Sequence, residues 1–305
     1  MDTRTKKYKN LTDDINKALK MEKRKKKHKI LYKILTTLFI VMVMFFTYAL
    51  FIEPNIMLTH EIHIKSSNMT DDFNGLKIAH MTDFHYGMTT NTKYLKRVVK
   101  EINRLKPDIF IFTGDLIDQT YKISKEEKKE IINCLKDINT TYGKYAVIGN
   151  HDYFNENYED ILKQANITLL NNSYDIIYNN DSSVLIYGVD DSLYSTPVID
   201  ILKDKNNIKA NYRIVLTHES DYTEKIAFNT SSDLILAGHS HNAQVNIPFI
   251  KPFYLPEGAK KYYKPYYNLN NTDIYISNGI GTSSFKIRFM SVPSINFYRI
   301  TKATD

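Results

Sequence analysis

After residue 75, short apolar runs typical of buried strands alternate with segments in which apolar residues recur at the spacing of a helix. Short apolar runs at Leu76–Met81, Ile109–Thr113 and Tyr145–Ile148 predict buried strands. Between the first two, Tyr94–Leu105 has apolar residues at 95, 98, 99, 102 and 105, which is the spacing of one face of a helix. Ser124–Asn139 is a second predicted helix, with a serine as its N-cap. This alternation of strand and helix predicts a parallel sheet.

The flanking and later parts of the chain are richer in short strands. Residues 57–75 form a β segment, and Tyr158–Ala165 is a predicted helix. Segment 248–268 is a predicted long loop, whose residues 253–267 either contact lipid head groups or pack on the protein body. Further strands are predicted at Val184–Val189, Arg213–Thr217, Leu234–Ala237, Gln244–Ile247, Ile274–Ser277, Phe285–Phe289 and Ile295–Ile300. The strand-rich end predicts a second sheet.

Residues 34–52 form a run of 19 residues without a charged side chain. At about 1.5 Å per helical residue, this run nearly spans a bilayer core of about 30 Å. Its centre, Val41–Phe46, is apolar on every side of a helix, unlike a half-exposed soluble helix. Thirteen basic residues precede the run and Glu53-Pro54 follows it. The positive-inside rule therefore predicts a single-pass transmembrane helix with its N-terminus in the cytoplasm.

Charge separates the N-terminal tail from the rest of the chain. Residues 1–33 contain 13 Lys or Arg and 4 Asp or Glu, and we expect a solvated, poorly ordered cytoplasmic tail. The remaining residues contain 28 basic and 30 acidic side chains. The tail therefore has a charge of +9 and the rest of the chain −2, so the positive net charge comes from the tail. This balance does not support a nucleic-acid-binding body, and the tail is expected to meet anionic lipid head groups. The single cysteine, Cys134, excludes an intrachain disulfide and is expected to be buried.

The apolar run has two interpretations, an uncleaved signal anchor and a cleaved signal peptide. Thr47-Tyr48-Ala49 is a poor cleavage site and the basic region is unusually long, so we favour the anchor. The chain then divides into a cytoplasmic tail (1–33), a transmembrane anchor (34–52), a linker with the first β segment (53–75) and a main domain (76–305). The main domain is expected at the cell membrane, outside the cytoplasm.

Polar side chains follow five of the predicted strands, at the point where each strand ends. Asp83 and His85 are two residues apart, so they project to the same side of an extended chain. The other groups are Asp115 after Ile109–Thr113, Asn150 with His151 and Asp152 after Tyr145–Ile148, His218 after Arg213–Thr217, and His239 with His241 after Leu234–Ala237. Because ligands bind beyond the carboxyl ends of strands in α/β sheets, these side chains are expected to converge.

The converging set mixes imidazole nitrogens with carboxylate and amide oxygens. Such a set suits divalent ions such as Mn²⁺, Fe or Zn²⁺. It contains more ligands than one ion needs, whereas two ions about 3.5–4 Å apart, bridged by one carboxylate, would use the whole set. Asp115 is the natural bridge, because it is the single carboxylate between the two groups. The sequence therefore predicts a site for two divalent metal ions.

The order Asp-x-His, Gly-Asp, Gly-Asn-His-Asp, His and Gly-His-x-His resembles the calcineurin-like metallophosphoesterase superfamily over residues of about 76–300. The segment Ser277–Ser283, followed by Arg288-Phe289, resembles the membrane-associated, phosphodiesterase-type branch, although Asn278 replaces the Arg of the expected Ser-Arg-Gly. The resemblance implies an α/β fold, a four-layer αββα sandwich, here preceded by one N-terminal transmembrane helix.

The resemblance also implies a role for each residue of the set. One metal would be held by Asp83, His85, Asp115 and His241, and the other by Asp115, Asn150, His218 and His239. His151 would lie beside the substrate as a proton donor, oriented by Asp152. Four residues outside the set have structural interpretations: a core position for His80, a solvent-facing one for His60 and His63, and one at the surface or behind the ligands for Glu219.

These expectations combine into a membrane-anchored, dinuclear metal-dependent phosphohydrolase. A hydroxide bridging the metals would attack phosphorus, and protonated His151 would help the leaving oxygen depart. Phosphodiesters are the expected substrates, and the short linker suggests phosphates of lipids or of the cell envelope. We expect a monomer. Two alternatives remain: a pyrophosphatase acting on lipid-linked or sugar-nucleotide substrates, and a non-catalytic, metal-binding surface module.

Overall fold

The structure is a computed structural model that describes residues 3–204 and 207–303 of the 305-residue chain. The outermost residues of the predicted tail and main domain, 1–2 and 304–305, lie outside the described residues, as do 205–206. The chain divides into two compact units, residues 1–49 and residues 50–305.

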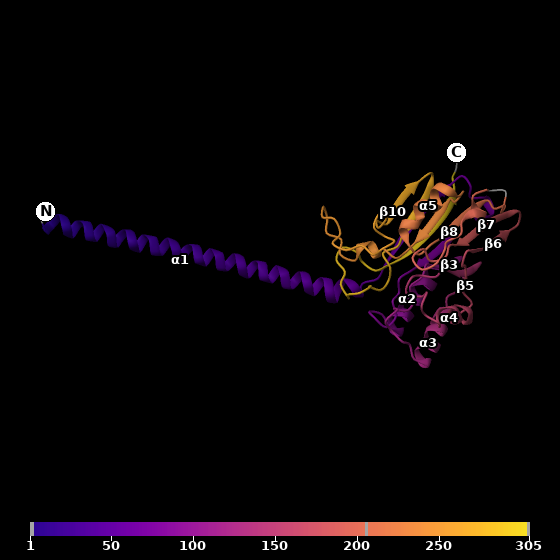
Figure 1. Ribbon diagram of the computed structural model, residues 1–305, viewed down its shortest axis with the longest axis horizontal. Helices are drawn as coiled ribbons and strands as arrows, with labels where there is room; N and C mark the ends of the chain where they lie inside the picture. The colour runs from indigo at the N-terminus through magenta and orange to yellow at the C-terminus, as the bar shows by residue number, and fades with distance from the viewer. Residues whose placement is uncertain (1–2, 205–206, 304–305) are drawn as a thin grey trace. The chain divides into compact units, whose positions relative to one another are not determined.

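The first unit is formed by one helix, α1 (Thr3–Thr47; Figure 1). The prediction of a poorly ordered tail is wrong for residues 3–33, because strong helix formers such as Lys, Leu and Glu extend the helix through this segment. The apolar side chains that follow are exposed rather than packed in a core; Phe39, for example, is 60% exposed. The helix is long and apolar enough to cross a membrane.

The second unit contains two six-stranded mixed sheets. The first sheet has the order β1-β12-β2-β3-β4-β5. Its central strands β2, β3 and β4 and its edge strand β5 are parallel, as the alternating pattern predicts, and β12 pairs antiparallel with β2. Its strands are β1 (Leu58–Ser66), β2 (Leu76–Met81), β3 (Ile109–Phe112), β4 (Gly143–Ala146), β5 (Thr168–Leu169) and β12 (Ser294–Lys302).

The second sheet has the order β10-β11-β9-β8-β7-β6. The four inner strands are parallel, and each edge strand joins its neighbour in an antiparallel hairpin. Its strands are β6 (Ser173–Asn179), β7 (Ser182–Gly188), β8 (Tyr212–Leu216), β9 (Leu234–Ala237), β10 (Tyr266–Leu269) and β11 (Thr272–Ile276).

The two sheets pack face to face between two layers of helices. One core cluster lies between the sheets and joins Ile78 and Ile111 to Val184 and Ile214. A second cluster lies under α2, α3 and α4, and a third lies under α5, on the opposite outer face (Figure 1). The expected four-layer αββα arrangement is therefore confirmed. The helices are α2 (Thr92–Leu105), α3 (Lys125–Lys136), α4 (Tyr158–Gln164) and α5 (Thr223–Asn229), with short turns η1 (Tyr48–Ile52), η2 (Glu53–Asn55), η3 (Asp71–Phe73), η4 (Asp200–Leu202), η5 (Ser220–Tyr222) and η6 (His241–Ala243).

Two predicted strands are wrong. Gln244–Ile247 and Phe285–Phe289 are loops that meet in one isolated bridge, Val245 to Phe289. The alternation of apolar and polar residues suggested extended chain in both segments. Gln244 at the start of the first, and Ser284 and Met290 on either side of the second, instead have positive φ angles, which a strand does not accommodate. The sequence pattern also missed the edge strands β6 and β10 and the helix α5, since polar Asn, Asp and Tyr residues dilute their periodicity.

Candidate metal centre

The loops that follow five strands bring the predicted ligands together. β2, β3 and β4 of the first sheet lead to Asp83, Asp115 and Asn150, and β8 and β9 of the second lead to His218 and His239. The carboxyl ends of both sheets thus meet at one edge, as predicted. All carboxylate and imidazole members proposed as ligands are buried, and none is more than 6% exposed. The predicted ligands are Asp83, His85, Asp115, Asn150, His218, His239 and His241.

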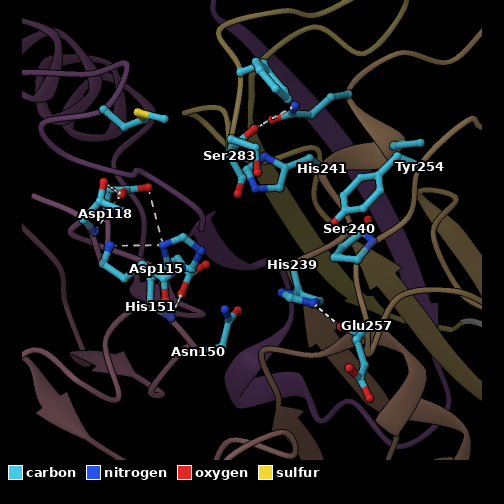
Figure 2. A pocket seen from close by; sticks show the side chains of 18 of the residues that line it. Asp115, Asp118, Asn150, His151, His239, Ser240, His241, Tyr254, Glu257 and Ser283 are labelled. Atoms are coloured by element: carbon cyan, nitrogen blue, oxygen red, sulfur yellow. Dashed lines mark hydrogen bonds and ion pairs between the residues drawn. The ribbon is translucent and has the colours of Figure 1, made fainter.

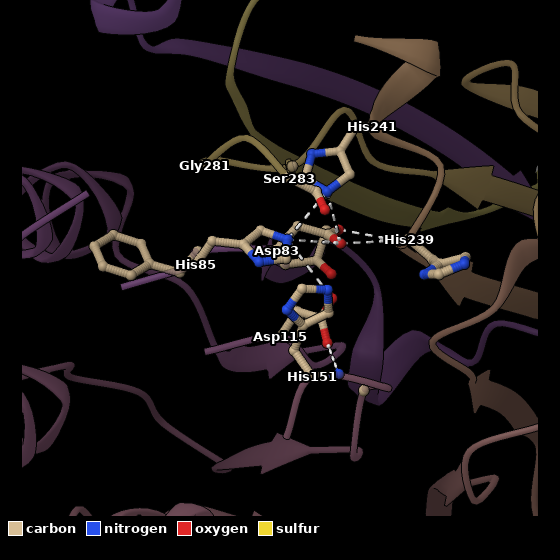
Figure 3. Close-up of polar contacts among 12 residues, drawn as sticks. Asp83, His85, Asp115, His151, His239, His241, Gly281 and Ser283 are labelled. Atoms are coloured by element: carbon tan, nitrogen blue, oxygen red, sulfur yellow. Dashed lines mark hydrogen bonds and ion pairs between the residues drawn. The ribbon is translucent and has the colours of Figure 1, made fainter. Parts of the chain in front are cut away.

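Asp83, His85 and His241 form the first cluster (Figure 3). Nε2 of His241 lies 3.3 Å from Oδ1 of Asp83 and 3.1 Å from Nε2 of His85. Nε2 of His85 lies 3.9 Å from Oδ1 of Asp83. Three potential ligand atoms therefore face one point, which is the geometry that a bound cation needs.

Asp115, His218 and His239 form the second cluster. Nε2 of His218 lies 3.3 Å from Oδ2 of Asp115, 3.2 Å from Nδ1 of His239 and 3.2 Å from Oδ1 of Asn150. The same Oδ2 of Asp115 lies 3.6 Å from Nε2 of His85, in the first cluster. The Asp115 carboxylate therefore lies within 3.6 Å of an imidazole nitrogen of each cluster.

The hydrogen bonds behind the ligands fit a metal as well. Nδ1 of His218 lies 2.6 Å from the carbonyl oxygen of Thr113, and Nε2 of His239 lies 2.6 Å from that of Glu257. A carbonyl oxygen only accepts, so these nitrogens carry the protons and the opposite nitrogens present lone pairs. The lone pairs point into the cluster, where a divalent cation would take them. The donor set therefore fits the implied ions.

The ligand loops have unusual backbone conformations. Five of these residues have positive φ angles, between 48° and 65°, although none is a glycine. Such conformations cost about 1–3 kcal/mol each and gather at functional sites. The neighbouring glycines have a packing reason: a Cβ at Gly149 would lie 2.4 Å from Oδ1 of Asp115. The five residues are Asp83, His85, Asp115, His239 and His241.

His151 lies at the wall of the site, but Asp152 does not orient its ring as expected. The Asp152 carboxylate accepts hydrogen bonds from the backbone N–H groups of Asp115 (2.6 Å), Leu116 (2.9 Å) and Gly149 (3.2 Å). Its contribution is thus to hold the two ligand loops together. Burial and the neighbouring Asp115 charge raise the pKa of Asp152 to about 8.

The residue beside the His151 ring is Asp118, which the sequence interpretation missed. Its Oδ2 lies 3.5 Å from Nδ1 of His151 and 3.6 Å from Nδ1 of His85. The backbone N–H of Gln119 also donates to Nδ1 of His151, at 3.1 Å. Burial alone would lower the pKa of His151, but the negative charges of Asp115 and Asp118 outweigh it and the pKa is raised. The signal in the sequence was a second Asp three residues after Asp115.

A buried arginine lies behind the first cluster. Nη2 of Arg288 lies 3.3 Å from Nδ1 of His241, and the guanidinium donates to the carbonyl oxygens of Ser291 (2.6 Å) and Asn278 (2.8 Å). Burial lowers the pKa of Arg288 to about 10. The sequence interpretation used this residue only as a mark of resemblance. Its contacts instead tie two loop segments, those around Asn278 and Ser291, to the candidate ligand His241.

Most other single residues lie where the sequence predicts them. His80 and Cys134 are buried, as expected, and Nε2 of His80 lies 2.8 Å from the Thr113 hydroxyl. His60 and His63 are exposed, also as expected. A surface position for Glu219 is wrong, because its carboxylate is fully buried and accepts from the N–H and hydroxyl of Ser192 at 2.9 and 3.0 Å.

A cavity of about 810 Å³ opens directly onto the clusters (Figure 2). Its inner wall contains Asp115, Asn150, His151, His239 and His241. Its outer wall is formed by loops that carry apolar and aromatic side chains. The site therefore combines metal-ligating groups with a space large enough for a small organic ligand.

Comparisons with known proteins agree with this geometry. A family model described as calcineurin-like phosphoesterase matches residues 76–243. The uncharacterized metallophosphoesterase YkuE of Bacillus subtilis is 31% identical over 85% of this chain and 90% of its own length. A transmembrane protein with metallophosphoesterase domain from Danio rerio is 25% identical over 76% of this chain and 54% of its own length. The UDP-2,3-diacylglucosamine pyrophosphatase LpxG of Chlamydia trachomatis is 22% identical over 87% and 95%, respectively.

Proposed function

The chain belongs to the calcineurin-like phosphoesterase family, a family of metal-dependent hydrolases of phosphoric esters, and from this premise we propose that it is a membrane-anchored, dinuclear phosphodiesterase. The observation that carries the proposal is the position of Asp115, whose Oδ2 lies within 3.6 Å of a ligand nitrogen in each cluster.

Two divalent ions, Mn²⁺, Fe or Zn²⁺, would bind the two clusters. Asp83, His85, His241 and Asp115 would hold one, and Asp115, Asn150, His218 and His239 the other. When bound, such ions supply a nucleophile from water at neutral pH and neutralise the charge of the phosphate oxygens. The chain's own residues fix the ligand orientation through the carbonyl oxygens of Thr113 and Glu257.

His151 would donate the proton to the leaving group. The hydrolysis joins a water oxygen to phosphorus, breaks one P–O bond and places a proton on the departing alcohol oxygen. Nδ1 of His151 lies between the Gln119 N–H (3.1 Å) and Oδ2 of Asp118 (3.5 Å), so Nε2 is the nitrogen that would face a substrate. In the neutral ring Nδ1 accepts from Gln119, whereas in the protonated ring Nδ1–H would face Asp118, whose charge would stabilise it. His151 also groups with His85 and Asp115 as a third candidate ligand set, and the metal content of a His151 variant distinguishes a ligand from a proton donor.

The activity is tested on the full-length chain in detergent micelles. We expect about two ions per chain after loading with Mn²⁺ or Zn²⁺, measured by elemental analysis. We expect hydrolysis of bis-p-nitrophenyl phosphate to exceed that of p-nitrophenyl phosphate and to stop with a chelator. One ion per chain, or preference for the monoester, would contradict the proposal.

A pyrophosphatase is the second candidate, supported by the likeness to LpxG. A nucleotide-linked pyrophosphate added to the same assay separates the two. Cleavage of the pyrophosphate with an intact diester would favour this candidate and overturn the diesterase.

The anchor and its orientation are part of the proposal. The exposed apolar side chains of α1 and the preceding basic residues support a cytoplasmic N-terminus and an outer catalytic unit. Single cysteines at the exposed positions Asn10 and Lys65, in a Cys134→Ser background, can be treated in intact cells with a membrane-impermeant maleimide. We expect labelling of Lys65→Cys alone. Labelling of Asn10→Cys alone would show the opposite topology, with the N-terminus outside the cell.

A further inference from the structure

We infer that the outer part of the cavity binds a long apolar chain, so that the substrate is an amphiphilic phosphodiester of the lipid type. This inference rests on the proposed phosphodiesterase activity and adds the substrate class to it. It is carried by the lining of the cavity, by the exposure of the lining side chains and by the distribution of charge.

The lining changes from polar to apolar away from the metal clusters. The inner wall holds the ligands and His151, whereas two loops, residues 248–256 and 283–290, contribute much of the apolar outer wall. Figure 2 shows Tyr254 and Ser283 of these loops on the same side of the cavity as His241. The apolar and aromatic residues that line this outer part include Leu193, Val245, Phe253, Tyr254, Phe285 and Ile287.

Several of these side chains face water in the free protein. Phe253 is 80% exposed, Tyr254 71% and Phe285 74%. Phe249 and Ile250, which precede Phe253 in the same loop, are exposed as well. Large apolar groups gathered at the mouth of a polar site mark a ligand groove or an interaction surface rather than ordinary surface. An apolar chain leaving the phosphate would cover them.

The charges along the cavity argue against a highly charged substrate. Among the described residues that line it, none is Lys or Arg, and the charged ones include Asp115, Asp118 and Glu257. Apart from the metal ions and protonated His151, both at the reacting phosphate, no described lining residue would supply a cation for a second phosphate group. A diester has a single negative charge, which the ions would balance, and its apolar substituent would lie on the aromatic wall. The lining thus matches a diester with a long alkyl or prenyl chain.

The test uses the full-length chain in detergent micelles and a series of alkyl p-nitrophenyl phosphates, from methyl to decyl. Each buried CH₂ favours binding about fourfold, so the specificity constant should rise by at least tenfold along the series. Phe253→Ser and Phe285→Ser should each reduce the decyl-to-methyl ratio by about fivefold or more. Phe228→Ser is the matched control, because Phe228 is 59% exposed on α5, and it should keep the parental ratio.

The outcomes separate the inference from the proposed function. Hydrolysis of bis-p-nitrophenyl phosphate without any chain-length preference, or an equal effect of all three variants, overturns the inference alone. No hydrolysis of any diester overturns the proposed function first. Two further probes distinguish the sources of the chain: dioleoyl phosphatidylglycerol and a polyprenyl-phosphoryl sugar. Cleavage of either probe supports the inference and identifies the source of the chain. If neither probe is cleaved, the inference of a lipid substrate is wrong.

Discussion

Oε1 of Glu53 accepts a hydrogen bond of 2.6 Å from the backbone N–H of Ser291, although 238 residues separate the two in sequence. Oε2 of Glu53 accepts from the N–H of Met290 at 3.0 Å. The hydroxyl of Ser291 in turn donates to the carbonyl oxygen of His241 at 2.6 Å. A buried carboxylate just after the predicted anchor thus holds the loop that supports His241, a candidate metal ligand.

Replacing Glu53 with Ala should therefore destabilise the second unit. Two N–H groups would lose their acceptor, at a cost of about 1–3 kcal/mol for each donor left buried. We expect a loss of about 3 kcal/mol, measured as a lower thermal midpoint of the full-length chain by circular dichroism. Glu61→Ala is the control, because the Glu61 side chain is 48% exposed and its ion pair with Arg299 contributes at most about 1 kcal/mol. Equal midpoints for both variants would contradict the role of Glu53.

Replacing His151 with Asn should lower turnover while leaving the metal content unchanged. A positioned proton donor contributes about 10²- to 10⁴-fold to the rate, most for substrates with poor leaving groups. The measurement pairs kcat for an alkyl diester with elemental analysis of the same sample. His63→Asn, at a side chain that is 63% exposed, should change neither. A His151 variant that loses both activity and metal would be a ligand variant, and the proton-donor role would be wrong.

Replacing Asp118 with Asn should move the alkaline limb of the pH–rate profile to lower pH. The pKa of His151 is raised because nearby carboxylates, including Asp118, outweigh the effect of burial. A proton donor is lost as the pH rises through its pKa, so removing one negative charge brings that loss to lower pH. The profile of kcat with an alkyl diester measures the shift. An unmoved limb, matching that of the exposed control Asp200→Asn, would contradict the electrostatic role of Asp118.

Replacing Gly238 with Ala should disturb the first metal cluster. A Cβ at Gly238 would lie 2.2 Å from Oγ1 of Thr82 and 2.7 Å from Oδ2 of Asp83, so the ligand must move. We expect a loss of about 1–3 kcal/mol, together with weaker metal binding in a competition assay against a chromogenic chelator. Gly75→Ala is the control: no atom lies within 4 Å of its Cβ, and only its positive φ of 89° adds strain. Both variants losing metal affinity equally would exclude a specific effect on Asp83.

The fold was largely predictable because strand and helix periods are local properties. The buried runs before Asp83 and Asp115 need no long-range information, and Ser124 caps α3 as predicted, here in a capping box with Glu127. The loops were not predictable in the same way. Residues 244–247 and 285–289 alternate like strands, yet Gln244 in the first segment and Ser284 and Met290 beside the second have positive φ angles, which the alternation does not encode.

The candidate ligands were predictable because each follows a strand end, where the topology of an α/β sheet gathers ligands. Asp118 and Glu53 had no such position. Their importance comes from tertiary contacts. Asp118 lies beside His151, and Glu53 accepts from Met290 and Ser291, which are 237 and 238 residues away in the sequence. Asp152 shows the same limit: its neighbour in sequence is His151, but its carboxylate binds the backbone of Asp115 and Leu116.

Replacing Asp115 with Asn should reduce binding at both clusters, whereas replacing His239 with Asn should affect only one. Oδ2 of Asp115 lies 3.6 Å from Nε2 of His85 and 3.3 Å from Nε2 of His218. An amide of the same shape keeps an oxygen but loses the charge that would balance two cations. Elemental analysis should therefore find less than one tightly held ion per chain in Asp115→Asn and about one in His239→Asn. If Asp115→Asn instead kept one ion and lost only the other, the carboxylate would belong to a single metal, and the shared position that supports the dinuclear site would be wrong.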